Sequence, residues 1–160
     1  MDKRPQDVSF PTIPEDRFHR QAVLLRVVDG DTIDVEIDLG WSMKLKERLR
    51  LERLDTPEIN KKAEKEAGKW VKAKVEELLP EGTPLIITSM AYDRTGHIRG
   101  KYGRTLAVVY RAKDGFCINQ HLIEEKLAWC VDDRGSSLEE RTLSALTGIP
   151  INNREDADNS

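Results

Sequence analysis

Five charged side chains in or beside predicted turns could together bind a metal ion and a phosphate group. Asp31 lies in the turn DGDT, Asp55 and Glu58 lie in DTPE, Arg50 lies in the preceding stretch RLRLERL, and Arg104 lies in KYGR. Carboxylate oxygens are ligands of hard cations such as calcium, and guanidinium groups match phosphate oxygens. Each residue also has an ordinary interpretation, as a turn former, a helix N-terminal acid or a solvated arginine. The five together favour a site for metal-assisted phosphate chemistry.

Strands are expected to position these side chains. Residues 33–39 alternate between apolar and acidic types, which predicts a half-buried strand, and Asp31 continues its apolar row. The alternation over residues 43–54 is imperfect, which predicts a bulge near Glu52 or Arg53. The direction of the side chains that follow such a bulge cannot be taken from the alternation. The predicted strands are 20–28, 33–39, 43–54, 83–92 and 101–112.

The order of strands and helices predicts the fold class. Helices are expected at about residues 60–79, 119–126 and 136–146. Five strands with a long helix after the third match an OB-fold barrel, an α+β fold dominated by β with about three helices. The three tryptophans, Trp41, Trp70 and Trp129, are expected in the core or at its rim.

The composition predicts one domain whose overall charge is too nearly balanced to attract a polyanion. The 160 residues carry 26 basic and 29 acidic side chains, so a polyanion would have to be held by local arginines and a metal. Residues 19–148 are expected to form the domain, with polar tails at 1–18 and 149–160, the latter disordered. Cys117 and Cys130 are expected to be buried free thiols. No signal sequence is recognised, which predicts a cytoplasmic protein.

Four motifs in order resemble the staphylococcal nuclease (thermonuclease) family. They are VVDGDTI, RLRLERLDTPE, KYGRTLAVVY and INQHLIEEKLAW, within residues 20–147. Four ordered motifs are more specific than any one of them. The resemblance implies a five-stranded OB-fold barrel that cleaves phosphodiester bonds of DNA and RNA with calcium. It also implies a nucleic acid substrate, preferably single-stranded, no membrane, and a monomer. A nuclease without a signal sequence would suit a viral or mobile-element origin or a role in repair or degradation, and the sequence does not choose among these.

The resemblance implies roles for the metal-binding residues. Asp31 and Asp55 would be carboxylate ligands of calcium, and the backbone carbonyl of Thr56 would be a further ligand. Glu58 would orient the attacking water and take its proton.

The resemblance also implies the phosphate and substrate contacts. Arg50 and Arg104 would hold the scissile phosphate, and Lys101 and Tyr102 would contact the substrate. In the last predicted strand, Arg104 continues the apolar row of Leu106, Val108 and Tyr110. The sequence has Asp132-Asp133-Arg134 where the staphylococcal enzyme has tyrosines beside the bound base, so base stacking would be absent or supplied elsewhere. The alternative is a catalytically inactive OB-fold module that binds single-stranded nucleic acid or a protein partner.

Overall fold

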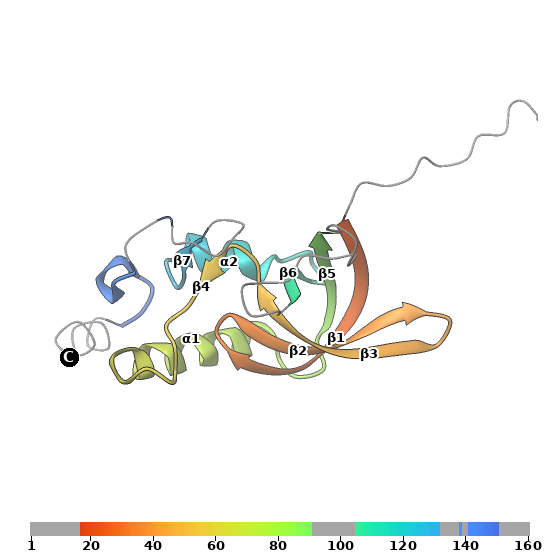
Figure 1. The fold of residues 1–160 in the computed structure, drawn as a ribbon, viewed down its shortest axis with the longest axis horizontal. Helices are drawn as coiled ribbons and strands as arrows, with labels where there is room; N and C mark the ends of the chain where they lie inside the picture. The colour runs from red at the N-terminus through yellow and green to blue at the C-terminus, as the bar shows by residue number, and fades with distance from the viewer. Residues whose placement is uncertain (1–16, 91–104, 132–137, 139–140, 151–160) are drawn as a thin grey trace, which may run out of the picture.

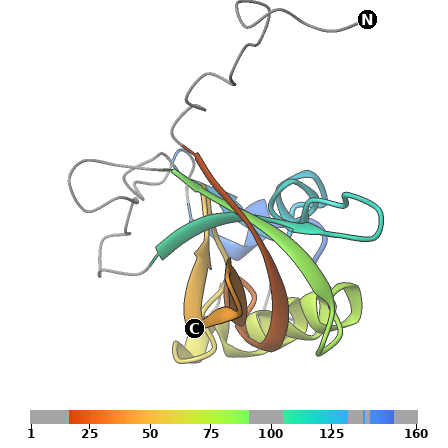
Figure 2. The ribbon, with the colours of Figure 1, turned by 90° about the vertical axis from the view of Figure 1, so that its right-hand side faces the viewer.

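A closed five-stranded barrel forms the centre of the protein. The computed structural model describes residues 17–90, 105–131, 138 and 141–150. The barrel strands follow the order β1-β2-β3-β6-β5, and all neighbours are antiparallel except β3 and β6 (Figures 1 and 2). Their bounds are β1 Arg17–Asp29, β2 Thr32–Gly40, β3 Met43–Leu51, β5 Pro84–Met90 and β6 Thr105–Arg111. The predicted OB-fold barrel is therefore confirmed.

Alternating side chains fill the barrel interior. Ile33 and Val35 of β2 are fully buried, and Ile33 is paired with the buried Leu49 of β3. In β6 the buried row consists of Thr105, Ala107 and Val109, with small side chains at its start. The apolar row on the other face of β6 is only half-buried. Apolar content alone therefore does not identify the inner face of this strand.

A break after β3 redirects the chain from the barrel into a second, smaller sheet. Arg53 has a left-handed backbone with φ of 69°, which interrupts the strand. The chain continues as β4, Leu54–Asp55, which pairs with β7, Trp129–Cys130, so that Asp55 lies opposite Trp129. In place of the bulge predicted near Glu52 or Arg53, the structure has a turn that ends β3 at Leu51. Its effect is to place Asp55 where the barrel meets this two-stranded sheet.

Helix α1, Lys65–Leu78, packs against the chain that follows β4. A short 3-10 turn, η2 at Lys62–Glu64, leads into it, and its buried face includes Gly68, Val71 and Val75. A Cβ atom on Gly68 would lie 2.7 Å from the carbonyl oxygen of Pro57, so glycine permits this close approach. The DTPE loop is thereby held between the barrel and α1.

Helix α2, Ile118–Glu124, is tied to the barrel by the buried Asn119. Its Oδ1 accepts the N–H of Val109 at 2.9 Å, and its Nδ2 donates to the carbonyls of Glu52 and Ala107, each at 3.1 Å. These bonds join the end of β3 to β6. Both partners of the parallel β3–β6 pair are thus fixed by one side chain.

The third predicted helix is wrong in the described part of its range. Only η4, a 3-10 turn at Leu143–Ala145, is present there, so the described residues contain two α-helices. Thr142 is extended, with φ of −107° and ψ of 147°, and its carbonyl accepts a hydrogen bond from the indole of Trp129. This tertiary contact fixes a non-helical backbone. No described helix is long and apolar enough to cross a membrane.

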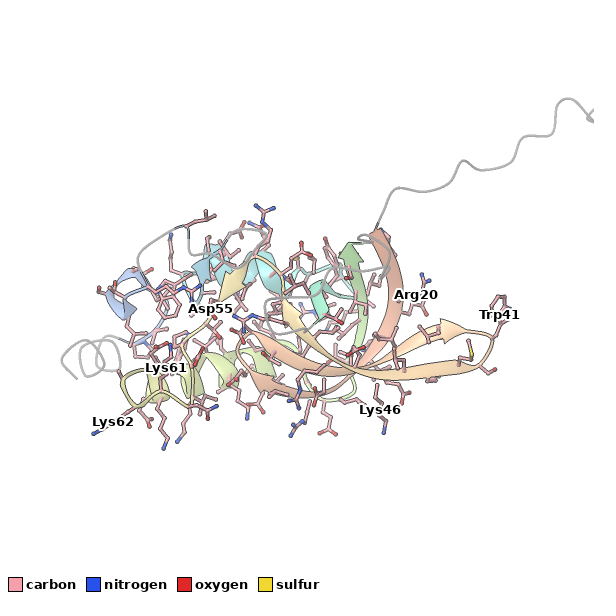
Figure 3. All side chains as sticks on the ribbon, viewed as in Figure 1. Arg20, Trp41, Lys46, Asp55, Lys61 and Lys62 are labelled. Carbon is pink, nitrogen blue, oxygen red and sulfur yellow. The ribbon has the colours of Figure 1, made fainter. Side chains whose placement is uncertain are left out.

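The cysteines and tryptophans only partly follow expectation. Cys117 and Cys130 form no disulfide, as predicted, but they are half-buried where burial was expected. Trp129 is buried and Trp70 packs against the core. Trp41 is 94% exposed at the tip of the β2–β3 hairpin, where the expectation of a core position is wrong (Figure 3). The reason is that the hairpin extends beyond the strands that close the barrel (Figure 1).

Candidate metal and phosphate site

The first carboxylate, Asp31, is buried at the start of β2. Its residue exposure is 4%, and its backbone carbonyl accepts the N–H of Leu51 at 2.8 Å. Thr32 Oγ1 donates to Asp31 Oδ1 at 2.9 Å, and the N–H of Thr56 donates to Asp31 Oδ2 at 3.2 Å. The tight turn before β2 therefore directs this carboxylate inward and gives it two hydrogen-bond donors.

The second carboxylate, Asp55, is linked to the first by Arg50. Asp55 is 5% exposed in β4 (labelled in Figure 3), and Arg50 Nη2 lies 2.6 Å from Asp55 Oδ1 and 3.3 Å from Asp31 Oδ2. On the other side, Arg141 Nη1 lies 2.6 Å from Asp55 Oδ2. Two buried acids thus share one guanidinium, and Asp55 contacts a second.

The charges in this cluster change one another's pKa values. Burial raises the pKa of Asp55, and a hydrogen bond with Asp31 and its charge act in the same direction, whereas Arg50 and Arg141 lower it. Burial lowers the pKa of Arg50, but the charges of Asp31, Asp55 and Glu58 outweigh burial and raise it. Arg50 therefore stays protonated beside the two acids.

An open cavity of about 540 Å³ gives access to the cluster. Glu58 lies on its wall with 49% of its side chain exposed, and the N–H of Glu58 donates to Glu64 Oε1 at 3.1 Å. Asp29 also faces this cavity, and burial raises its pKa, with the nearby charge of Asp31 adding to the effect. The full lining is Asp29, Asp31, Arg50, Thr56, Pro57, Glu58 and Asn60.

The donor set suits a calcium ion. The described residues contain no group of three or more His, Cys, Asp or Glu side chains arranged around one point. Calcium accepts carboxylate, carbonyl and water oxygens together, so Asp31 and Asp55 are a sufficient pair of anionic ligands when Thr56 and water complete the shell. Thr56 Oγ1 is buried without a hydrogen-bond partner in the structure, and the N–H of the same residue donates to Asp31. The residues present therefore fit the cation that the sequence predicted.

The structure brings together four of the charged or metal-binding residues predicted from sequence, with a fifth on the cavity wall. Asp31, Asp55, Thr56 and Arg50 form the cluster, and Glu58 lines its entrance. Arg104, Lys101 and Tyr102 lie outside the described residues. Sequence reasoning missed Arg141 as a contact of Asp55, because it lies far along the chain in no recognisable motif. It also treated Asp29 only as a turn residue, although DGD places a second acid at the same turn.

Comparison with known protein families shows the family to which the chain belongs. Residues 48–147 match the family described as staphylococcal nuclease homologue, and these residues make up most of the chain. The chain belongs to this family. The match includes Arg50, Asp55 and Glu58 and begins after Asp31, and this family generally contains nuclease hydrolases. No curated protein sequence matches the chain.

Proposed function

We propose that the protein is a calcium-dependent endonuclease that hydrolyses phosphodiester bonds of DNA, RNA or both. The observation that carries the proposal is the pair of buried carboxylates, Asp31 and Asp55, which Arg50 bridges. Asp31 and Arg50 also line an open cavity. A binding module has no need of two buried acids beside a phosphate-binding guanidinium. Buried charged groups that shift one another's pKa values beside a cavity are candidates for a functional site.

The side chains have distinct roles in this proposal. Asp31, Asp55 and the Thr56 carbonyl would hold calcium, which when bound supplies positive charge to polarise a phosphoryl oxygen. Glu58 reaches into the cavity from a loop and accepts a proton from the attacking water. Its partly exposed side chain leaves room for that water.

Arg50 would stabilise charge on the phosphate as the bond breaks. Its side chain is 20% exposed and lines the cavity, so its donors are directed by its contacts with the two acids before substrate arrives. Arg104 is proposed as the second arginine, and Lys101 and Tyr102 as further substrate contacts. Because the net charge is −3, affinity for nucleic acid would come from these local groups.

Cleavage of labelled single-stranded DNA and RNA tests the proposal. We expect cleavage with calcium, none with EDTA, and a large loss in the variant Arg50→Lys, which retains charge but not the planar fork. Arg26→Gln is the matched control, because Arg26 also pairs with an aspartate, Asp34, at 2.9 Å, but outside the cavity. Binding of the strand without cleavage under any divalent cation would establish the inactive OB-fold module instead.

A further inference from the structure

Arg141 reaches the cluster from the last described segment of the chain. Its Nη1 lies 2.6 Å from Asp55 Oδ2, while Arg50 Nη2 occupies the other oxygen, Oδ1, at the same distance. Both oxygens of a buried carboxylate are thus in contact with guanidinium groups. The Arg141 side chain is 41% exposed, so one side of it faces solvent.

The same short sheet that positions Asp55 also positions Arg141. Trp129 is the cross-strand neighbour of Asp55, and its Nε1–H donates to the carbonyl of Thr142 at 3.0 Å. The next residue, Leu143, is 4% exposed and packs in the core. Arg141 directly precedes Thr142 and Leu143, which are both held in place. The fold therefore fixes the backbone of Arg141 close to Asp55.

A cation bound to Asp55 would be repelled by the positive charge of the Arg141 guanidinium. Calcium binds carboxylate oxygens at roughly 2.3–2.6 Å, so an ion on Oδ2 would lie within a few ångströms of the Arg141 charge. Like charges at such separations repel, even where water weakens the interaction. Arg141 must therefore move away from Oδ2, or remain close and lower the affinity of the site.

We propose that Arg141 is a positioning residue that neutralises and orients Asp55 in the absence of metal and competes with the divalent cation for it. The inference rests on the proposed function, because it assigns the regulation of the same cation site. Arg141 thereby sets the calcium concentration at which the site fills. Arg50 differs in role, because it bridges both acids and faces the cavity where phosphate would bind.

Calorimetric titration of metal-free protein with calcium chloride tests this role without any nuclease assay. We expect Arg141→Gln to bind calcium roughly three- to tenfold more tightly than the unchanged protein, since one nearby positive charge is removed. Arg141→Lys retains the charge and should stay within about twofold. The matched control, Arg26→Gln, removes the same charge from another aspartate pair and should leave the affinity unchanged.

The outcomes separate this inference from the proposed function. If the unchanged protein binds calcium and Arg141→Gln binds it equally or more weakly, the competing role is overturned while the cation site stands. If the unchanged protein binds no calcium, the proposed calcium site and this inference both fail. Should Arg141→Gln not fold, Trp129→Phe carries the test, because it removes the donor to Thr142 and should tighten calcium binding by about twofold. Unchanged affinity in that variant would also overturn the role.

Discussion

The two ends of strand β2 differ in which side chains are buried: an acid is buried at one end, and apolar side chains are exposed at the other. At its start, the acid Asp31 is buried and paired with Arg50. At its other end, apolar side chains of the β2–β3 hairpin face solvent. Trp41, labelled in Figure 3, is 94% exposed, and Met43 is 51% exposed. β2 has nine residues, so these ends lie about 30 Å apart at roughly 3.3 Å per residue.

Barrel closure explains this difference. β6 pairs with β3 only over Leu49–Leu51, and β1 pairs with β2 only as far as Ala22 and Ile37. The alternating pattern continues beyond these rows, so the hairpin keeps an apolar face that the described barrel strands do not cover. Its outer face has cross-strand ion pairs such as Arg48–Asp34, at 2.8 Å. Alternation thus defines the two faces of a hairpin, and burial depends on where neighbouring strands end.

The largest effect is expected from a substitution at the charged end of β2. Arg50→Lys should lower kcat by about 10²–10³, the range for loss of one preorganised donor to a developing charge. Its contacts with Asp55 and Asp31 should be only partly kept, because lysine lacks the planar fork. Steady-state cleavage of an oligonucleotide measures this. A loss confined to KM would show that Arg50 contributes only to substrate binding.

The next effect concerns the packing that holds the charged end together. Gly68→Ala should lower the free energy of unfolding by about 1–3 kcal/mol, because the new Cβ would meet the Pro57 carbonyl at 2.7 Å and Ile59 N at 3.0 Å. Urea denaturation measures it. Lys69→Ala on the exposed side of α1 is the control and should change stability by less than about 0.5 kcal/mol. Equal stability of the two variants would show that α1 can shift away from the loop.

A smaller, pH-dependent effect is expected from the charged outer face of the hairpin. A hydrogen bond from Arg48, with a further bond from Arg26, lowers the pKa of Asp34 from its usual 3.8, although burial opposes this. Its contribution to stability should therefore be present above pH 3.8 and be lost as the pH falls through the lower folded-state pKa. Asp34→Asn should cost less than about 1 kcal/mol near neutral pH. Urea denaturation over a pH series should show the two proteins converging in acid, and a constant difference would contradict the ion pairs.

The smallest effect on stability is expected from a substitution at the exposed end of β2, in the β2–β3 hairpin. Trp41 has a positive φ of 48°, which disfavours residues other than glycine, asparagine and aspartate. Trp41→Asn should leave stability unchanged or raise it by roughly 0.5 kcal/mol, despite the loss of the largest side chain type. Trp129→Phe, in the core, should by contrast destabilise the protein. Destabilisation by Trp41→Asn would show that the indole packs on the hairpin.

Local patterns and ordered motifs predicted the barrel and most of the residues at the candidate site. Alternation along residues 33–39 was sufficient to predict β2. The strand predicted over residues 43–54 is divided in the structure, because β3 ends at Leu51 and β4 begins at Leu54. The motif residues Asp31 and Asp55 were predicted because each lies in a recognisable turn. The role of Arg141 could not be predicted, since it depends on a tertiary hydrogen bond between Trp129 and Thr142. The exposure of Trp41 likewise depends on where β1 and β6 end, which their own sequences do not encode.

The partners of Asp55 also fix when the site can form during synthesis. Asp55 is made early, but its strand partner Trp129 and its ion-pair partner Arg141 are among the later residues of the chain. Contacts between distant residues form slowly, because the intervening chain must first be ordered. A growing chain that has been made as far as Asp55 therefore has both acids and Arg50, but it lacks Trp129 and so cannot yet form the β4–β7 sheet. The full set of contacts around Asp55 is therefore complete only after nearly all of the described residues have been made.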